Sequence, residues 1–277
     1  MTMPDVSQLA AVPPFCRLNP RQLRAILDLA QVTRLIAREL VFEEGQPACQ
    51  FHLLLSGHLR VVRMTAEGDQ IIMLHIPAGQ MFGIGAALGQ VIHQTTAIAA
   101  DDCVVLSWPN ALWPVFTARY DGFAAETLRA FGARSNEMSN RIVELSTKLA
   151  EQRIACALLR MISQSGRKVA RGIKIDFPIT RQNIADMTGT TLHTVSRLLS
   201  AWEKQGMIES TRCHIVVTDP HRMVMMSEFA GCIVVGKPAL PAVLQLAYSG
   251  EADTAARSSA RKVATSSRYS AQASITV

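Results

Sequence analysis

The sequence lacks the cysteine pairs and long apolar runs that mark secreted and membrane proteins. Its six cysteines are scattered singly along 277 residues, without a CxxC pair, at positions Cys16, Cys49, Cys103, Cys156, Cys213 and Cys232. This spacing favours neither a disulfide framework nor a structural metal site. No apolar run reaches the roughly 18 residues of a membrane span, and residues 1–30 have no signal-peptide pattern. We therefore expect a cytoplasmic protein with reduced thiols and no membrane partner.

Charge is sparse, at 18% of residues, and unevenly distributed. Residues 1–150 carry 12 Lys and Arg against 13 Asp and Glu, whereas residues 151–227 carry 11 against 6. A compact basic segment is typical of a partner with a phosphate backbone, although an ordinary solvated surface has the same composition. The 49% of hydrophobic residues excludes a wholly disordered chain, and the length favours two domains.

The residue pattern of the first half of the chain is typical of an all-β domain. Runs rich in Val, Ile, Leu and Phe fill residues 32–109, and glycines interrupt them about every 11 residues, which indicates an antiparallel barrel or sandwich. A short helix capped by Asn19, with Pro20 in its first position, should precede this module. The expected strands are 33–42, 51–56, 58–65, 69–76, 95–100 and 103–108, with a hairpin turn at Glu67-Gly68-Asp69.

Beyond Pro114 the apolar period changes to that of a long helix, expected over residues 121–151. Polar residues lie outside its apolar stripe, including Arg134, Arg141 and Lys148. Such a stripe belongs either to a helix packed on its own domain or to a coiled coil, and a long helix beside a complete barrel favours a parallel dimer. The stripe consists of Phe131, Met138, Ile142, Leu145 and Leu149.

A helix–turn–helix pattern follows in the basic segment. Residues 152–166 continue helical, Gly166 and Gly172 bracket a basic turn, and residues 173–178 alternate like a strand. Thr180 caps a short helix that stops at Gly189, and a second helix begins at Thr190 or Thr191. A predicted β wing follows at residues 213–217.

The second short helix has two distinct faces. Val195, Leu198, Leu199 and Trp202 form its buried stripe, while His193, Ser196, Arg197 and Ser200 recur at the same spacing on the other side. These donors suit base edges in a major groove. The alternative is a merely solvated face, but the helix, glycine turn, helix and wing together favour DNA recognition.

Residues 179–217, ITRQNIADMTGTTLHTVSRLLSAWEKQGMIESTRCHIVV, resemble the winged helix-turn-helix of the Crp/Fnr family of bacterial transcription regulators. The likeness covers about residues 10–227 and implies an α+β fold. It implies a cyclic-nucleotide-binding-like β-barrel (jelly roll) at 1–118, a dimerisation helix at 119–151 and a winged helix-turn-helix domain at 152–227. The extension at 228–277 lies beyond the likeness, and we expect it to be largely disordered, because its end is rich in Ala and Ser.

The resemblance also implies roles in DNA binding. The TVSR motif places Ser196 and Arg197 where Fnr-type members read a TTG half-site, and His193 stands where Fnr itself has Glu. Arg181 and Gln182 are expected to contact phosphates, with plain helix capping as the alternative. The full set of expected DNA-contacting residues is Thr180, Arg181, Gln182, Thr191, His193, Ser196, Arg197 and Ser200.

Two known effector chemistries of the family are missing from this sequence. Members that bind cyclic nucleotides use Gly-Glu-Leu for the ribose and Arg-Ser for the phosphate, but this chain reads Gly83-Ile84-Gly85 and His93-Gln94. Without the carboxylate and the guanidinium we expect no cyclic nucleotide. An iron–sulfur cluster of the Fnr kind needs four cysteines, three of them near the N-terminus, where only Cys16 lies, so we expect no cluster.

Without either of these signatures, the sequence looks most similar to the nitric-oxide-responsive Nnr/Dnr regulators of denitrification within the family. That resemblance implies a haem b sensor with His52, His58, His75 and His93 as candidate ligands and Cys49 or Cys103 as thiolate alternatives. Each histidine also has an ordinary interpretation, as a satisfied core residue or, for His75, a solvent-facing one.

We therefore expect a homodimeric regulator, an activator, with a double-stranded DNA operator and RNA polymerase as partners. The first alternative is an effector-independent regulator of this family that is controlled by its own abundance. The second is a thiol hydrolase, but no nucleophile sits in a glycine elbow or beside a paired base, so an enzyme is not expected. The third is a ligand-binding module without DNA contact, which the complete winged motif argues against.

Overall fold

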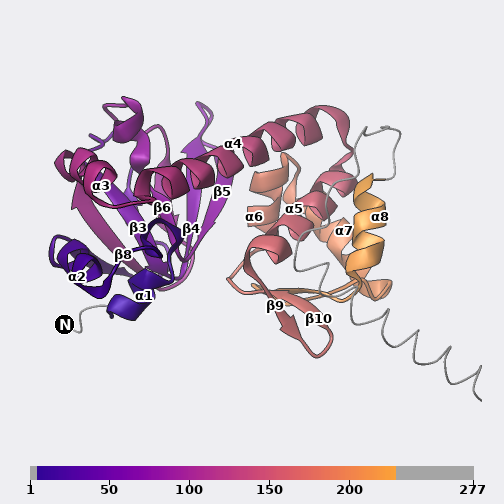
Figure 1. Ribbon diagram of the computed structural model, residues 1–277. Coiled ribbons are helices and arrows are strands. Elements are labelled where there is room, and N and C mark those ends of the chain that lie inside the picture. The colour runs from indigo at the N-terminus through magenta and orange to yellow at the C-terminus, as the bar shows by residue number, and fades with distance from the viewer. Residues whose placement is uncertain (1–4, 229–277) are drawn as a thin grey trace, which may run out of the picture. The chain divides into compact units, whose positions relative to one another are not determined.

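The computed structural model describes residues 5–228, and the predicted disordered extension lies outside this range except for Glu228. From α1 to α8 the described chain forms a β-rich N-terminal domain, a long central helix and a helix-turn-helix domain (Figure 1). The predicted fold class is confirmed. None of the described helices is both long and apolar enough to cross a membrane.

The N-terminal domain is built from two antiparallel four-stranded sheets, ordered β1-β8-β3-β6 and β2-β7-β4-β5. The inward side chains of both sheets, such as Leu54, Leu59 and Val105, are fully buried between them. The strands are β1 (Gln31–Leu35), β2 (Leu40–Phe42), β3 (Gln50–Ser56), β4 (His58–Met64), β5 (Gln70–Pro77), β6 (Gln80–Phe82), β7 (Thr96–Ala99) and β8 (Cys103–Pro109).

The predicted strand at 33–42 is wrong, because the segment forms two strands in different sheets. β1 pairs with β8 and β2 pairs with β7, so the chain crosses from one layer to the other between them. The crossing includes Arg38 at φ 77°, a left-handed conformation that ends any continuous strand. The short strand β6 was not predicted, because three residues are too few to show an alternating pattern.

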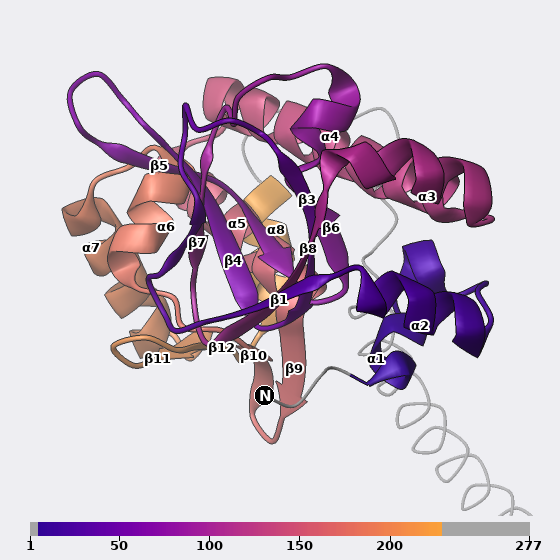
Figure 2. The ribbon, with the colours of Figure 1, turned by 90° about the vertical axis from the view of Figure 1, so that its left-hand side faces the viewer.

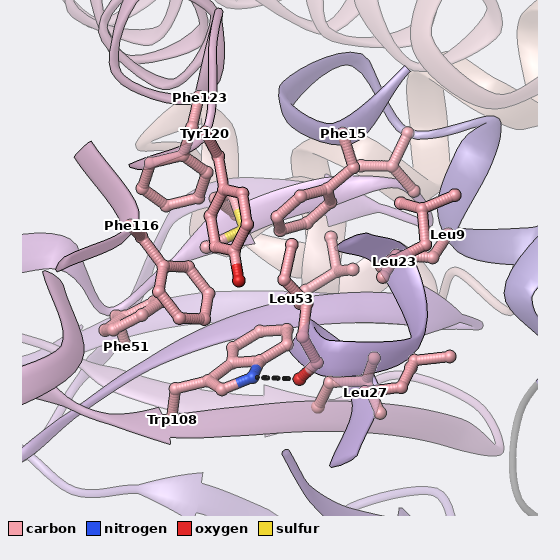
Figure 3. Close-up of a cluster of buried hydrophobic side chains, with 14 of the residues drawn as sticks. Leu9, Phe15, Leu23, Leu27, Phe51, Leu53, Trp108, Phe116, Tyr120 and Phe123 are labelled. Atoms are coloured by element: carbon pink, nitrogen blue, oxygen red, sulfur yellow. Dashed lines mark hydrogen bonds between the residues drawn. The ribbon is translucent and has the colours of Figure 1, made fainter. Parts of the chain in front are cut away.

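Helices cover the sheet that contains β3 and β8 (Figure 2). An aromatic core lies between these helices and the sheet (Figure 3). Its rings are fully buried and belong to Phe15, Phe51, Trp108, Phe116 and Phe123. The Trp108 indole Nε1 donates a hydrogen bond of 2.9 Å to the carbonyl of Ile26. The helical segments are α1 (Val6–Ala10), η1 (Pro13–Phe15), α2 (Pro20–Asp28), η2 (Ile84–Leu88), η3 (Asn110–Leu112) and α3 (Trp113–Arg119). Asn19 caps α2 as predicted.

The predicted helix over 121–151 is two helices, α4 (Phe123–Thr147) and α5 (Ala150–Ser165). Lys148 has an extended backbone and Leu149 is the N-cap of α5. Two side chains stabilise the break, since Gln152 Oε1 accepts a hydrogen bond from Leu149 N at 2.9 Å and Arg153 donates to Lys148 O at 3.1 Å. Leu149 therefore lies beyond the central helix.

The C-terminal domain confirms most of the predicted boundaries. Thr180 caps α6 (Arg181–Thr188), Gly189 ends it at φ 59°, and Thr191 caps α7 (Leu192–Lys204). The predicted basic turn is a hairpin of β9 (Gly166–Val169) and β10 (Gly172–Ile175). The strand predicted at residues 173–178 therefore ends earlier, before Phe177. The wing is β11 (Ile208–Ser210) and β12 (Ile215–Val217), in a sheet ordered β11-β12-β10-β9, followed by α8 (Pro220–Glu228).

Candidate nucleic-acid interface

The two faces of α7 are those that its periodicity indicates. Val195, Leu199 and Trp202 are buried, whereas Leu198 of the predicted stripe is only partly buried. Trp202 Nε1 donates a hydrogen bond of 3.2 Å to Glu151 at the start of α5. On the opposite face His193 and Arg197 are exposed, while Ser196 and Ser200 are partly exposed. The helix thus offers a guanidinium, an imidazole and hydroxyls along one accessible face. These groups can read base edges.

The remaining expected DNA contacts lie at the N-termini of α6 and α7. The Thr180 hydroxyl accepts a hydrogen bond from Asn183 N and the Thr191 hydroxyl accepts one from Thr194 N, both at 3.1 Å. Both threonines therefore act as caps in this structure, whatever else they contact. Gln182 donates to Asp186 at 2.7 Å on its own helix, and Arg181 keeps about a third of its side chain exposed.

An open hollow joins these helix ends to the wing. It is lined by Thr180, Arg181, Gln182, Leu192, Ser210, Thr211 and Arg212. Sequence reasoning missed Leu192 and Arg212 as candidate DNA contacts. Leu192 is 46% exposed at the first position of α7, suited to the methyl group of a thymine. Its spacing of three residues before Val195 is that of the buried stripe, so the sequence contained no signal of this exposure. Arg212 was detectable only as a cation directly before the predicted wing.

The central helix presents its apolar stripe outward and its polar residues inward. Phe131 is 41% exposed, Ile142 64% and Leu145 45%, and Met138 is partly exposed. Leu149 is also exposed, although it lies beyond α4. The sequence interpretation missed Leu128, which is 55% exposed and continues the same heptad spacing.

The polar side of α4 contacts the rest of the chain. Arg134 donates to Gln80 Oε1 at 2.6 Å, and Glu144 pairs with Arg160 of α5 at 3.0 Å. Lys148, just past the helix, donates to the carbonyl of Ser227 in α8. A helix whose charged face is satisfied internally and whose apolar face is open is built to bind a second apolar helix. This arrangement favours the dimer seam over packing on its own domain.

The predicted haem ligands fall into two separate groups. His52 is 4% exposed, its ring stacks on Phe42 and Phe82, and its Nδ1 lies 2.7 Å from Ser107 Oγ. Burial lowers the pKa of His52 to about 3, so the ring is neutral. A Cβ added at Gly83 would lie only 2.5 Å from His52 Cδ2, which shows how closely the ring is enclosed.

His93 belongs to the same group, and its loop is hydrogen-bonded to the loop at residues 45–48. Its ring stacks on Phe42 with centroids 3.7 Å apart. Its backbone N donates to Gln46 O at 2.9 Å and its carbonyl accepts from Gly45 N at 2.8 Å. Ala48 N donates to Val91 O at 2.9 Å, which adds a third bond between the two loops.

His58 and His75 lie elsewhere, on the outer face of β4 and β5. His58 Nδ1 is 2.9 Å from Asp101 Oδ2, and both rings contact Phe177. His75 was expected to face solvent, which is wrong, because the helix-turn-helix domain covers it; burial, with the nearby Arg60, lowers its pKa to about 3.

The cavity beside His75 is too small for a haem. His75 Nε2 has no hydrogen-bond partner among the described residues, but the cavity beside it has a volume of about 10 Å³, the size of one water molecule. Of the thiolate alternatives, Cys103 donates to the carbonyl of His58, and burial raises its pKa to about 12. Cys49 is exposed.

Comparisons with known proteins agree with the fold and the interface. Residues 152–226 match the Crp-like helix-turn-helix domain and residues 32–118 match the cyclic nucleotide-binding domain, which together exceed half of the chain. The chain is 26% identical over 212 residues to Electron transport regulator A of Shewanella oneidensis, covering 76% of this chain and 84% of that protein.

Two further relatives extend the likeness. The chain is 23% identical over 225 residues to the fumarate and nitrate reduction regulatory protein of Escherichia coli K12, covering 80% of this chain and 88% of that protein. The structure of FixK2 from Bradyrhizobium japonicum superposes with a TM-score of 0.64 at 24% identity, covering 73% of this chain and 99% of FixK2, and so supports the fold. The chain therefore belongs to the Crp/Fnr family, whose members are DNA-binding transcription regulators that act as dimers and are not enzymes.

Proposed function

We propose that this protein is a cytoplasmic homodimer that binds palindromic operators with Fnr-like TTG half-sites and activates transcription through contact with RNA polymerase. The observation that carries the proposal is the exposed face of α7, where Arg197, Ser196 and His193 lie beside the basic hollow at the wing. Arg197 supplies the bidentate donor that guanine O6 and N7 accept.

The operator is tested by fluorescence anisotropy with a labelled TTG palindrome and a scrambled duplex of equal composition. We expect the palindrome to bind at least about 1,000-fold more tightly at physiological salt. Equal affinity for both duplexes would contradict the proposal. Transcription from a promoter that carries the palindrome, with and without the protein, tests activation.

For the signal we propose nitric oxide, sensed through haem b, with denitrification genes as targets. The family likeness and the missing cyclic-nucleotide and iron–sulfur residues support this proposal. Relatives with names such as electron transport regulator and fumarate and nitrate reduction regulatory protein are in keeping with a respiratory role. Protein purified without oxygen and supplied with haemin should show a Soret band that shifts with nitric oxide and changes operator affinity.

The second candidate is an effector-independent regulator controlled by its own abundance. The packing of His52 and His93 favours it, because ring stacking and backbone hydrogen bonds already fill and close this part of the barrel. This candidate predicts a colourless protein that binds its operator fully without any added ligand. The same haemin titration separates the two, since no stable haem together with full operator binding contradicts the nitric-oxide hypothesis.

A further inference from the structure

One aromatic side chain of the DNA-binding domain packs against the outer face of the sensor barrel. Phe177 follows β10, and its ring centroid lies 4.8 Å from that of His58 on β4 and 4.8 Å from that of His75 on β5. Phe177 is only 2% exposed. The rings are tilted against Phe177 by 31° and 36°, and this three-ring cluster joins the two domains.

Hydrogen bonds and backbone restraints position both Phe177 and the histidines of this cluster. Pro178 restricts the backbone of Phe177 to extended conformations. The neighbouring backbone is also tied down, since Asp176 N donates to Ser165 O and Ile179 N to Cys213 O, both at 2.9 Å. The direction of the Phe177 ring is thus set by its own domain.

On the barrel side, Asp101 orients His58 twice. Its Oδ2 lies 2.9 Å from His58 Nδ1 and its Oδ1 accepts a hydrogen bond from His58 N at 2.7 Å. His75 stands opposite Arg60 in the β4–β5 ladder, so both histidines lie on the same outer face. The receiving surface is therefore part of a regular sheet.

A second contact lies at a separate point of the same junction. Arg141 of α4 donates to the carbonyls of Met73 on β5 and Met187 on α6. One guanidinium thus ties together the barrel, the central helix and the DNA-binding domain. Together with the Phe177 cluster, it gives the junction two separate points of contact.

We infer that Phe177 is a positioning residue for operator binding, which sets the half-site spacing that the dimer accepts. The inference rests on the proposed function. The separation of two half-sites follows from where a dimer holds its recognition helices. By fixing α7 relative to α4, the Phe177 cluster favours one separation of the half-sites. A loosely attached domain accepts several separations, each with lower affinity, because ordering the domain on DNA costs entropy.

The test varies the separation of two TTG half-sites in steps of one base pair and measures affinity for each duplex. The wild-type protein should show one preferred separation. Phe177→Ala should lose about tenfold in affinity at that separation, as two aromatic contacts are removed, and should bind the neighbouring separations almost equally well. Val91→Ala, which removes an 81% exposed apolar side chain, serves as the matched control and should keep the wild-type profile.

Phe177 is buried, so its replacement can impair folding of the DNA-binding domain. A second set of variants therefore removes the same contact by changing His75 on the barrel. His75→Ala leaves the DNA-binding domain intact and should flatten the separation profile as Phe177→Ala does, whereas His75→Phe restores a ring and should recover the preference. Proton NMR gives a readout that does not depend on DNA, since loss of the Phe177 ring current in Phe177→Leu should shift the ring signals of His58 and His75.

The outcomes are distinguishable. A flattened profile with unchanged dimerisation and unchanged affinity for a single half-site supports the inference. A sharp wild-type profile in His75→Ala overturns it and leaves the proposed function standing, even where Phe177→Ala fails to fold. A wild-type protein that does not distinguish the palindrome from scrambled DNA overturns both.

Discussion

Glu203 near the end of α7 accepts a hydrogen bond from the backbone N of Ser210 in the wing, 3.0 Å from its Oε1. The same oxygen accepts from the Ser210 hydroxyl, and the other carboxylate oxygen lies 3.7 Å from the guanidinium of Arg181. One side chain thus connects the recognition helix, the wing and the start of α6. Sequence reasoning missed Glu203, because its partners are distant in the chain or lie beyond the end of its helix.

Replacing Glu203 by Ala should lower the free energy of unfolding by about 1–3 kcal/mol, since Ser210 loses its acceptor in a partly buried position. Urea unfolding at neutral pH measures the change. Glu203→Gln keeps an acceptor oxygen and is the matched control, with a smaller loss. An Ala variant as stable as the wild type would show that the wing needs no such tie.

Arg197→Ala and Arg181→Ala should weaken DNA binding in different ways. Loss of Arg197 should cost about 1–3 kcal/mol and relax the preference at one base, because a base-edge contact disappears. Loss of Arg181 should weaken all sequences alike and reduce the slope of log affinity against log salt by about one, as for a phosphate contact. Titrations of operator and random DNA at several salt concentrations measure both. Equal losses on both DNAs for Arg197→Ala would refute its role in base reading.

His193→Glu should change the preference at a single base pair outside the TTG core. A carboxylate only accepts hydrogen bonds and pairs with cytosine N4, whereas imidazole also donates. Affinities for operators with each outer base substituted in turn measure the change. Unaltered preferences would place His193 off the bases.

Ile142→Asp should dissociate the dimer, because a charge placed in an apolar seam without a partner costs about 3–5 kcal/mol. Sedimentation velocity should show a monomer at concentrations where the wild type is dimeric, and operator affinity should fall in parallel. Asn140→Asp puts the same charge on the same helix outside the stripe and should remain dimeric. A dimeric Ile142→Asp protein would exclude this seam.

Acid should destabilise the protein through its buried histidines. The pKa of His52 is about 3 in the folded state against 6.5 ordinarily, so below pH 6.5 the unfolded chain takes up a proton that the folded protein refuses. This stability is complete above pH 6.5 and is lost as the pH falls toward 3, by about 1.4 kcal/mol per pH unit.

Urea midpoints of the wild type and His52→Phe, compared at about pH 7.5 and about pH 5, measure this effect. The substitution should reduce the pH slope without abolishing it, because His75 has a similarly lowered pKa. An identical slope in both proteins would mean that His52 titrates normally.

The sequence was sufficient to predict those features that depend only on residues close together in the chain. The Thr180 and Thr191 caps, the Gly189 turn and the buried stripe of α7 depend on neighbours within one or two helical turns. They were predicted correctly, except that Leu198 of the stripe is only partly buried. The β-rich half was likewise evident from alternation and turns. For the same reason the exposed face with Arg197 could be predicted before any tertiary contact was known.

Tertiary contacts decided the rest. The break between α4 and α5 depends partly on Arg153, which also donates to the carbonyl of Thr188 in α6, far along the chain. His75 has the pattern of a solvent-facing strand residue and becomes partly buried because Phe177 and residues of α4, α5 and α6, all distant in the chain, cover it. Periodicity reports which face of an element is apolar, whereas the partner of that face is chosen by packing among segments distant in sequence.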